Sequence, residues 1–287
     1  MSPLLTLNDG RTMPQLGLGL MRFGSEAETA EVLTRAAQAG YRLFDSAAVY
    51  GNEREVGDGL RQCGVARDEL FVTTKLWNAE HGRDKPRAAL TGSLERLGLE
   101  RIDLYLIHWP LPMFDQYVDT WRALIELQAE GLIGSIGVSN FNIEHLERLI
   151  DETGVVPAVN QIELHPLFQQ RELHAFHVRH GIVSQAWSPF GGGGLGGVPL
   201  LADPVLGKIA AKHGCTPSQV VLRWLTQYGA SAIPKATGTA HLAQNMASFE
   251  FTLDEGDLAD VAALDTPDGR SGPDPLTFAL KDLSELL

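Results

Sequence analysis

The sequence predicts an α/β fold, a (β/α)8 TIM barrel, and three observations carry this prediction. Short apolar segments alternate with longer amphipathic segments along most of the chain, which is typical of a parallel sheet with crossover helices. Eight such units can be counted, the number that closes a barrel. The chain has 287 residues, an ordinary length for an α/β barrel built as one domain. An open, doubly wound sheet is the structural alternative.

The repeating units define the expected strands and helices. The strands are expected at Leu16–Gly19, Leu43–Asp45, Leu70–Lys75, Ile102–His108, Ile133–Val138, Ala158–Ile162, Ile182–Trp187 and Ala232–Pro234. Helices are expected near residues 26–39, 52–62, 84–97, 116–130, 142–152, 169–180, 203–228 and 239–247. Because each strand is followed by a helix, neighbouring strands are expected to run parallel.

Two segments lie outside the repeat. Near the start, Asn8-Asp9-Gly10 separates two short β-prone runs, which predicts an N-terminal β-hairpin. At the end, the segment from Pro267 onward contains three prolines and is expected to form an ordered C-terminal tail or loop over the barrel. No linker separates these segments from the repeat, so we expect residues 1–287 to form a single domain.

Composition and charge restrict the possible partners. The net charge is −13, so we expect no nucleic-acid partner, and an anionic cofactor would need a local positive site. The sequence contains neither a membrane-spanning run nor a signal-peptide pattern, which favours a cytoplasmic monomer that does not bind membranes. Cys63 and Cys215 lack the spacing of metal ligands, so they are interpreted as incidental thiols and no metal is expected.

Ionisable residues end three successive predicted strands. Asp45, Lys75 and His108 stand at these ends, and Tyr50 follows shortly after Asp45. In a barrel the C-terminal strand ends form the active-site face, and neighbouring strands lie about 4.8 Å apart. A buried Asp–Lys pair could serve only to neutralise itself, but such a pair would not explain Tyr50 and His108.

These four residue types suit the reduction of a carbonyl group. Hydride addition leaves an alkoxide that needs a proton, and a tyrosine with a reference pKa near 10 retains one at neutral pH. Lys75 is expected to lower the pKa of Tyr50, Asp45 to hold Lys75 in place, and His108 to orient the carbonyl oxygen. Schiff-base chemistry on Lys75 is an alternative. We interpret Tyr50 as the proton donor.

Seven motifs occur in an order that resembles the aldo-keto reductase family. They are FDSAAVYGNE, TTKLWN, LYLIHWP, GSIGVSNF, VNQIELHP, AWSPFG and IPKAT. The resemblance covers roughly residues 5–265. Within the family, the short chain and the tryptophan in AWSPFG make the sequence similar to bacterial reductases of the 2,5-diketo-D-gluconate reductase kind. It implies NAD(P)H-dependent reduction of aldehydes and ketones, of the small dicarbonyl, keto-sugar or keto-acid type. A catalytically silent NADP(H)-binding regulatory barrel is the alternative from a different class.

The resemblance also implies the residues that bind the ligands. The implied cofactor-binding residues are Gly19, Leu20, Met21, Ser139, Asn140, Gln161, Trp187, Ser188, Phe190, Gly191, Lys235, Ala236, Thr237, His241 and Asn245. Ser139, Asn140 and Gln161 would bind the nicotinamide carboxamide, and Trp187 would stack on the ring. The implied substrate pocket contains Met21, Trp77 and Trp109, with contributions from Phe23 and residues 276–278.

Cofactor choice depends on the last motif and the helix after it. Lys235 and Thr237 favour NADPH, since backbone N–H groups at a helix N-terminus suit a phosphate. His241 stands where NADPH-preferring relatives carry an arginine, and histidine lacks the bidentate fork of arginine. We therefore expect NADPH, with NADH possible. The glycine-rich run Gly191–Gly197 is interpreted as a lid over the cofactor diphosphate.

Overall fold

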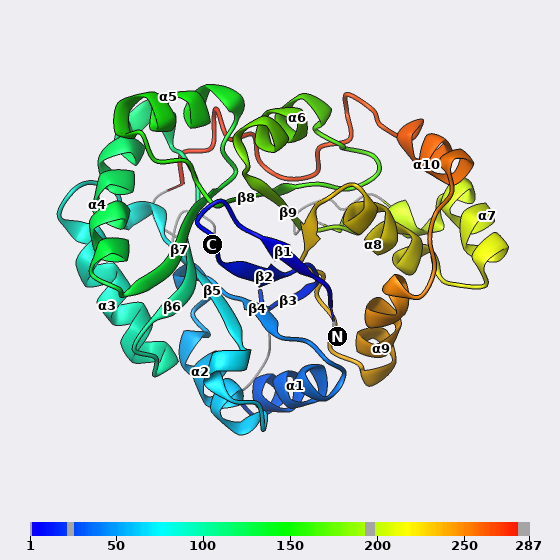
Figure 1. The fold of residues 1–287 in the computed structure, drawn as a ribbon, viewed down its shortest axis with the longest axis horizontal. Coiled ribbons are helices and arrows are strands. Elements are labelled where there is room, and N and C mark those ends of the chain that lie inside the picture. The colour runs from blue at the N-terminus through cyan, green and yellow to red at the C-terminus, as the bar shows by residue number, and fades with distance from the viewer. Residues whose placement is uncertain (1, 22–25, 193–198, 281–287) are drawn as a thin grey trace.

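Eight parallel strands form the wall of a barrel in the computed structural model, which describes residues 2–21, 26–192 and 199–280 (Figure 1). The strands neighbour one another in chain order from β3 to β10. A parallel bridge between Leu16 and Ala232 joins the first strand to the last. The predicted (β/α)8 barrel is therefore confirmed, and the open sheet is wrong.

The elements have the following bounds. The barrel strands are β3 (Gly17–Gly19), β4 (Leu43–Asp45), β5 (Phe71–Leu76), β6 (Ile102–Ile107), β7 (Ile133–Ser139), β8 (Val159–Glu163), β9 (Val183–Trp187) and β10 (Ser231–Ala232). The helices are α1 (Glu26–Gln38), α2 (Glu53–Gln62), α3 (Lys85–Leu97), α4 (Tyr117–Ala129), α5 (Ile143–Thr153), α6 (Arg171–His180), α7 (Pro204–His213), α8 (Pro217–Gln227), α9 (Thr239–Met246) and α10 (Glu255–Ala262). Short 3₁₀ segments are η1 (Ala48–Tyr50), η2 (Arg67–Glu69), η3 (Asn78–Glu80), η4 (Pro112–Phe114), η5 (Leu200–Ala202) and η6 (Ala247–Phe249).

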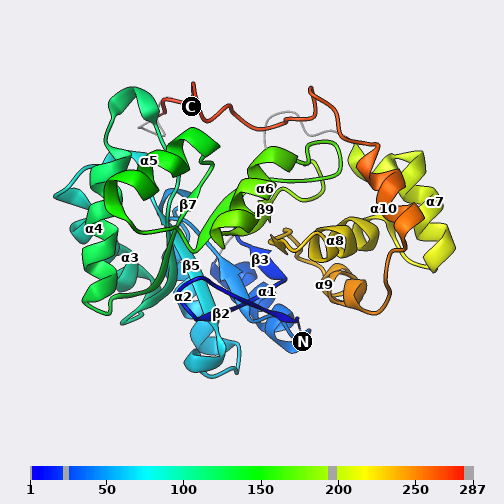
Figure 2. The same ribbon diagram turned by 45° about the horizontal axis from the view of Figure 1, so that its top comes forward.

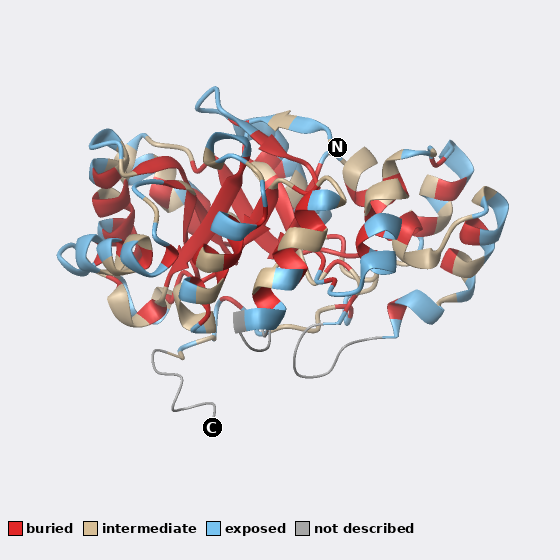
Figure 3. Ribbon diagram, turned by 90° about the horizontal axis from the view of Figure 1, so that it is seen from below, coloured by how far each residue is buried: buried red, intermediate tan, exposed pale blue. Residues whose placement is uncertain are grey.

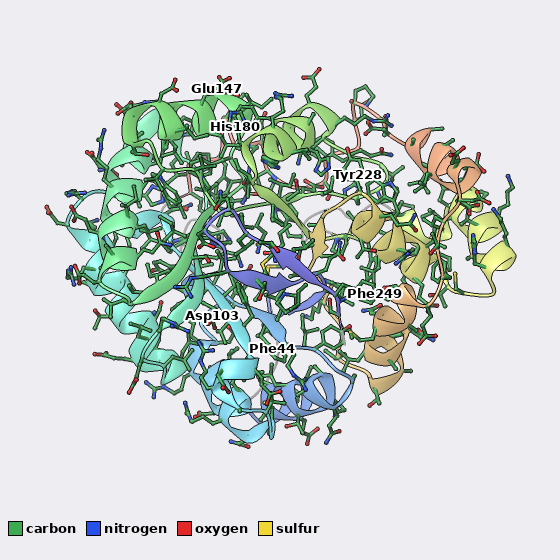
Figure 4. All side chains as sticks on the ribbon, in the orientation of Figure 1. Phe44, Asp103, Glu147, His180, Tyr228 and Phe249 are labelled. Carbon is green, nitrogen blue, oxygen red and sulfur yellow. The ribbon has the colours of Figure 1, made fainter. Side chains whose placement is uncertain are left out.

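The barrel wall is buried on both of its faces. Every residue of β5 and of β7 is buried, and Figure 3 shows the strands almost wholly in the colour of buried residues. Outside the wall, Phe44 belongs to the main apolar cluster, and the half-buried Phe249 packs against that cluster (Figure 4). Inside it, a second apolar cluster includes Leu43, Leu104 and Val159. Burial on both faces explains why the strands have continuous apolar runs.

A β-hairpin covers the N-terminal end of the barrel (Figure 1). It consists of β1 (Leu4–Thr6) and β2 (Thr12–Pro14), which pair antiparallel. Gly10 in the turn has a φ of 83°, which glycine adopts without steric cost. Met13 of the hairpin is fully buried and packs into the inner apolar cluster. The predicted hairpin is confirmed, and it keeps water from the floor of the barrel.

The predicted helix at 203–228 is two helices, α7 and α8. Gly214, with a φ of 62°, ends α7, because a left-handed residue stops a helix and glycine tolerates that conformation. The side chain of Thr216 then accepts a hydrogen bond from the Gln219 amide and starts α8, with Pro217 in its first turn. The single-helix prediction was wrong. Gly214, Thr216 and Pro217 are ordinary helix stop and start signals, so the sequence itself contained the information that separates the two helices.

Two further differences concern the end of the chain. The last strand is Ser231–Ala232 rather than Ala232–Pro234, since Pro234 has no N–H to continue the ladder. Helix α10 was not predicted; it is capped by Asp254, which precedes it and whose side chain accepts a hydrogen bond from the Asp257 backbone amide. Its eight residues are too few for a clear apolar periodicity.

Residues 263–280, here named the C-terminal strap, cross the C-terminal end of the barrel strands. Figure 2 shows the strap running above the barrel, on the opposite side from the hairpin. The expected tail over the barrel is confirmed for these residues, and residues 281–287 lie outside the described part of the chain. We call the end that the strap crosses the mouth of the barrel.

Helix α10, which leads into the strap, is anchored to α7 by a buried carboxylate. Asp257 accepts hydrogen bonds from Lys212 Nζ at 2.8 Å and from His213 Nε2 at 2.7 Å, and it is 4% exposed. Burial opposes ionisation, but the bonds from Lys212 and His213 outweigh it and lower the pKa of Asp257 to about 2.

We expect Asp257→Asn to lower the free energy of unfolding at pH 7 by about 1–2 kcal/mol. A depressed pKa stabilises the fold above the unfolded-state value near 3.9, and this stabilisation is lost as the pH falls toward about 2. Urea unfolding should therefore show the two proteins converging between pH 4 and pH 2. The control is Asp260→Asn: Asp260 also lies on α10, but its ion pair with Lys208 of α7 is exposed. This substitution should change the free energy of unfolding little. If the difference in unfolding free energy between the wild type and Asp257→Asn did not depend on pH, the ionised Asp257 carboxylate would not be what anchors α10 to α7.

Candidate active site

A buried ion pair lies at the mouth, where β4 and β5 end. Lys75 Nζ is 2.5 Å from Asp45 Oδ1 and donates a second hydrogen bond to the carbonyl oxygen of Ser46, at 2.8 Å. Lys75 is fully buried and Asp45 is 2% exposed. The two strands are parallel neighbours in the barrel, so two of the predicted strand-end residues are in direct contact.

Tyr50 lies beside this pair, at the end of η1. Gly51 follows it with a φ of 69°, which lets the chain turn toward α2. Lys75 Nζ is 5.2 Å from the centre of the Tyr50 ring. The His108 ring stands edge-on to Tyr50, with 6.1 Å between the ring centres. The structure thus brings together the four residues that the sequence predicted as catalytic.

The two charges of the pair stabilise each other. Burial alone would lower the pKa of Lys75, but the negative charge of Asp45, together with Tyr50 and the hydrogen bond to Asp45, raises this pKa above its usual range. Burial raises the pKa of Asp45, and the positive charge of Lys75 opposes that rise. Lys75 is therefore an ammonium at neutral pH rather than a neutral amine.

The pKa of Tyr50 differs from the sequence expectation. Burial raises the pKa of the phenol, and this effect exceeds the lowering caused by the charge of Lys75; the charge of Asp45 raises it further. The expected influence of the lysine is present, but the net shift is upward. Tyr50 therefore stays protonated at neutral pH, the state that a proton donor requires.

His108 is a neutral imidazole. It follows β6 and is 8% exposed, and burial lowers its pKa well below the usual range, with the charge of Lys75 contributing. Its Nδ1 is buried and has no hydrogen-bond partner among the described residues, and Trp77 stands edge-on to the ring at 5.3 Å between centres. A neutral imidazole has one N–H donor, so His108 can bind a ligand oxygen without carrying a charge.

Asn140 lies at the mouth just after β7, with a φ of 64°. Asparagine adopts this left-handed conformation more readily than most residues. Its Nδ2 donates to the carbonyl oxygen of His108 at 3.0 Å and to Ser139 Oγ at 3.1 Å. Its Oδ1 accepts from Trp187 Nε1 at 2.8 Å. Because both amide hydrogens are used, the amide oxygen is the group that Asn140 offers a ligand.

The amide hydrogens of Gln161 on β8 are likewise both used within the protein. Its Nε2 donates to Asp45 Oδ2 at 2.8 Å and to Gln185 Oε1 at 2.7 Å. An amide side chain can supply both donors and an acceptor. In the structure Asn140 and Gln161 both present acceptors, which suits the NH₂ side of a carboxamide.

The chain between β10 and α9 forms the other half of the predicted cofactor site. Lys235, Thr237 and His241 are exposed there. Gly238 precedes α9, and within the described part of the chain no side-chain cap is seen on the first N–H groups of the helix, which suits a phosphate. Ala236 is 6% exposed and Asn245 is 4% exposed, so these two residues do not share the exposed edge, and their cofactor contacts stay a prediction.

The remaining predicted cofactor residues lie at the ends of β3 and β9. Gly19 ends β3, Leu20 is buried, Met21 is 39% exposed, Ser188 and Gly191 have φ values of 47° and 69°, and Phe190 is half-buried. Of the predicted lid, Gly191 and Gly192 are described, and the rest of the run lies outside the described residues.

The predicted substrate pocket is walled by aromatic side chains. Trp109 is 8% exposed and packs against Phe278 of the strap, with 4.2 Å between ring centres and the two rings tilted by 38°. Trp77 lies beside His108, and Leu276 of the strap is 47% exposed. The strap therefore contributes to the mouth as expected, while Phe23 lies outside the described residues.

Glu163, at the end of β8, fastens the strap, and sequence reasoning missed it. Its carboxylate accepts hydrogen bonds from the Ser271 amide at 2.7 Å, the Ser271 hydroxyl and the Gly272 amide at 2.9 Å. His165 Nε2 lies 3.1 Å from the same carboxylate. A Cβ on Gly272 would lie 2.4 Å from Trp187 Cη2, so only glycine allows this close approach. The signal was a carboxylate at the end of a buried strand.

The described residues contain no group of three or more His, Cys, Asp and Glu side chains arranged to hold a metal ion. Within the same part of the chain, no helix is long and apolar enough to cross a bilayer. The monomeric state, the cytoplasmic location and the single domain stay predictions.

The fold and the mouth define a (β/α)8 barrel with a buried Asp–Lys pair, a protonated tyrosine and a neutral histidine in one group. Residues 15–266 match the model of the aldo/keto reductase family. Methylglyoxal reductase DkgA of Escherichia coli O157:H7 is 50% identical over 275 residues, 96% of this chain and 98% of its own. An aldo-keto reductase of Mycolicibacterium smegmatis is 50% identical over 278 residues, 97% of this chain and 98% of its own.

Solved structures agree with these matches. A mutant of Gox0644 in complex with NADPH superposes with a TM-score of 0.90 at 48% identity, covering 97% of this chain and 99% of its own. An aldo-keto reductase of Bombyx mori in complex with NADP has a TM-score of 0.86 at 39% identity, covering 92% and 93%. The chain belongs to the aldo/keto reductase family and is an oxidoreductase.

We expect Glu163→Gln to loosen the strap. Glutamine keeps the shape of the side chain, but it lacks the charge that strengthens the bonds from Ser271 and Gly272. Amide hydrogen exchange in residues 271–280 should rise by about tenfold or more. Glu172→Gln, on the exposed face of α6, is the matched control and should leave the strap unchanged. Equal exchange in the wild type and Glu163→Gln would exclude Glu163 as the fastening residue.

Proposed function

We propose that the chain reduces small aldehydes and ketones with NADPH, and that Tyr50 is the proton donor. The observation that carries the proposal is the position of Tyr50, whose ring centre lies 5.2 Å from Lys75 Nζ in the buried Lys75–Asp45 pair. Relatives described as methylglyoxal reductases and structures in complex with NADPH support it. Substrates of the dicarbonyl, keto-sugar or keto-acid type suit a mouth that combines aromatic side chains with polar groups able to orient a carbonyl.

The residues present fit NADPH. The amide oxygens of Asn140 and Gln161 suit the carboxamide NH₂ group, and Trp187 is placed between them and the strap. Lys235 and the uncapped N-terminus of α9 suit the phosphates. When bound, NADPH supplies a hydride to the carbonyl carbon. Residues of this chain must then place the carbonyl and deliver a proton to its oxygen.

The four central residues divide this task. The neutral His108 donates an N–H to the carbonyl oxygen and sets its position. Tyr50 transfers its phenolic proton to the same oxygen as charge develops there. Lys75 stabilises the phenolate that remains, because an ammonium favours a neighbouring negative charge. Asp45 keeps Lys75 charged and in place.

We expect Tyr50→Phe to reduce turnover of methylglyoxal with NADPH by at least about 100-fold, because the donated proton is lost. The dissociation constant for NADPH should change little, and Tyr228→Phe should behave like the wild type. Stopped-flow turnover and fluorescence titration measure the two quantities. Wild-type turnover in Tyr50→Phe would contradict the role of Tyr50. Wild-type protein that binds NADPH but reduces no member of a carbonyl panel would indicate a regulatory barrel instead.

NADH use follows from the histidine on α9. His241 is exposed in the first turn of α9, close to Lys235 in sequence, and an imidazole lacks the bidentate fork with which arginine binds a phosphate. We therefore propose NADPH as the preferred cofactor, with NADH accepted as well.

His241→Arg should raise the ratio of kcat/KM for NADPH to that for NADH by about three- to tenfold. The guanidinium adds charge-assisted bonds to the 2′-phosphate, which NADH lacks. His241→Gln, which adds no charge, should leave the ratio near that of the wild type. Parallel steady-state assays with both cofactors measure it. An unchanged ratio in His241→Arg would place the 2′-phosphate away from α9.

A further inference from the structure

Three buried polar side chains form a row inside the barrel wall. Gln161 on β8 is in register with Gln185 on β9, and Gln185 is in register with Ser231 on β10. Gln185 and Ser231 are fully buried, and Gln161 is 2% exposed. An apolar cluster fills much of this interior, so the two amides need an explanation.

The hydrogen bonds of the row have a defined direction. Gln185 Oε1 accepts from Gln161 Nε2 at 2.7 Å, and Gln185 Nε2 donates to Ser231 Oγ at 3.2 Å. Gln161 Nε2 also donates to Asp45 Oδ2 at 2.8 Å. A carboxylate can only accept, so Asp45 attracts the NH₂ end of Gln161. The second hydrogen of that NH₂ group then needs an acceptor, and Gln185 supplies it.

Gln185 therefore supplies Gln161 with a hydrogen-bond acceptor, which an apolar side chain at the same position could not do. With a methionine or a leucine at position 185, one N–H of Gln161 would be buried without a partner, which is costly. The Gln161 amide would then rotate to pair this N–H group, and its oxygen would no longer point in the direction that it has in the structure. A residue that only filled space at position 185 would not need an amide.

We propose that Gln185 is a positioning residue that fixes the orientation of the Gln161 amide, so that the Gln161 oxygen accepts a hydrogen bond from the nicotinamide carboxamide. The inference rests on the proposed function, since it needs NADP(H) bound at the mouth. It assigns Gln185, which touches neither substrate nor cofactor, a part in recognising the carboxamide NH₂ group. Ser231 holds the far end of Gln185.

The test compares two ligands that differ only in that NH₂ group. NADP⁺ carries a carboxamide, and its 3-acetylpyridine analogue carries an acetyl group without N–H donors. The dissociation constants of both are measured by titration calorimetry, which needs no turnover. Wild-type protein should prefer NADP⁺, and Gln185→Met should reduce this preference by about three- to tenfold. An unchanged preference in folded Gln185→Met overturns the inference.

Control variants separate positioning from packing. Gln185→Glu keeps an acceptor oxygen in either protonation state and should preserve the preference for NADP⁺; its loss in this variant would overturn the inference. Thr73→Val removes a buried hydroxyl that has no hydrogen-bond partner among the described residues. This variant should also keep the preference for NADP⁺ over the analogue. If Gln185→Met does not fold, Gln185→Thr, which is too short to reach Gln161, gives the same test.

The outcomes distinguish the inference from the proposed function. Wild-type protein that binds neither ligand would contradict the proposed function itself. Wild-type protein that binds NADP⁺ more tightly than the analogue, with Gln185→Met showing the same ratio, would contradict only the role of Gln185. The pH dependence of binding adds a further readout, because a Gln161 amide that has turned away from Asp45 would change the titration of the Asp45–Lys75 pair.

Discussion

The buried ion pair between Lys75 and Asp45 is the interaction on which the mouth depends. Removing two charges from water is costly, and the cost is recovered only when the charges are close and their other hydrogen-bonding positions are filled. The Ser46 carbonyl and the Gln161 amide fill them. Loss of one partner would leave an uncompensated buried charge, which typically costs about 3–5 kcal/mol. The pair therefore constrains the ends of β4, β5 and β8 together.

Burial and the charge of this pair together determine the protonation of the neighbouring residues. Burial is the main cause of the lowered pKa of His108, and Lys75 adds to it. Burial also raises the pKa of Tyr50 by more than Lys75 lowers it, so His108 is neutral and Tyr50 is protonated. The two ends of the barrel preserve this environment. The hairpin places Met13 under the interior, and Glu163 fastens the strap across the mouth.

Much of this arrangement followed from the sequence because strand ends and parallel order are local properties. Asp45, Lys75 and His108 end successive strands, so their meeting could be predicted before any distance was known. The position of Glu163 at a strand end was a signal, but its partners could not be predicted, since they lie 108 and 109 residues further along the chain and no local pattern connects them. The direction of the Gln161 amide depends on side chains from two other strands. The upward shift of the Tyr50 pKa depends on burial, which the loop sequence does not reveal.

The state of Lys75 distinguishes this account from nucleophilic chemistry at the same residue. An ammonium supports the proton-donor role of Tyr50, whereas a Schiff base would require a neutral amine. The most direct measurement is the ¹⁵N NMR signal of Lys75 Nζ in labelled protein, followed from pH 6 to pH 11. The account predicts a charged ammonium up to about pH 10, because Asp45 raises the pKa of Lys75 above its usual range. A neutral amine near pH 8 would contradict it.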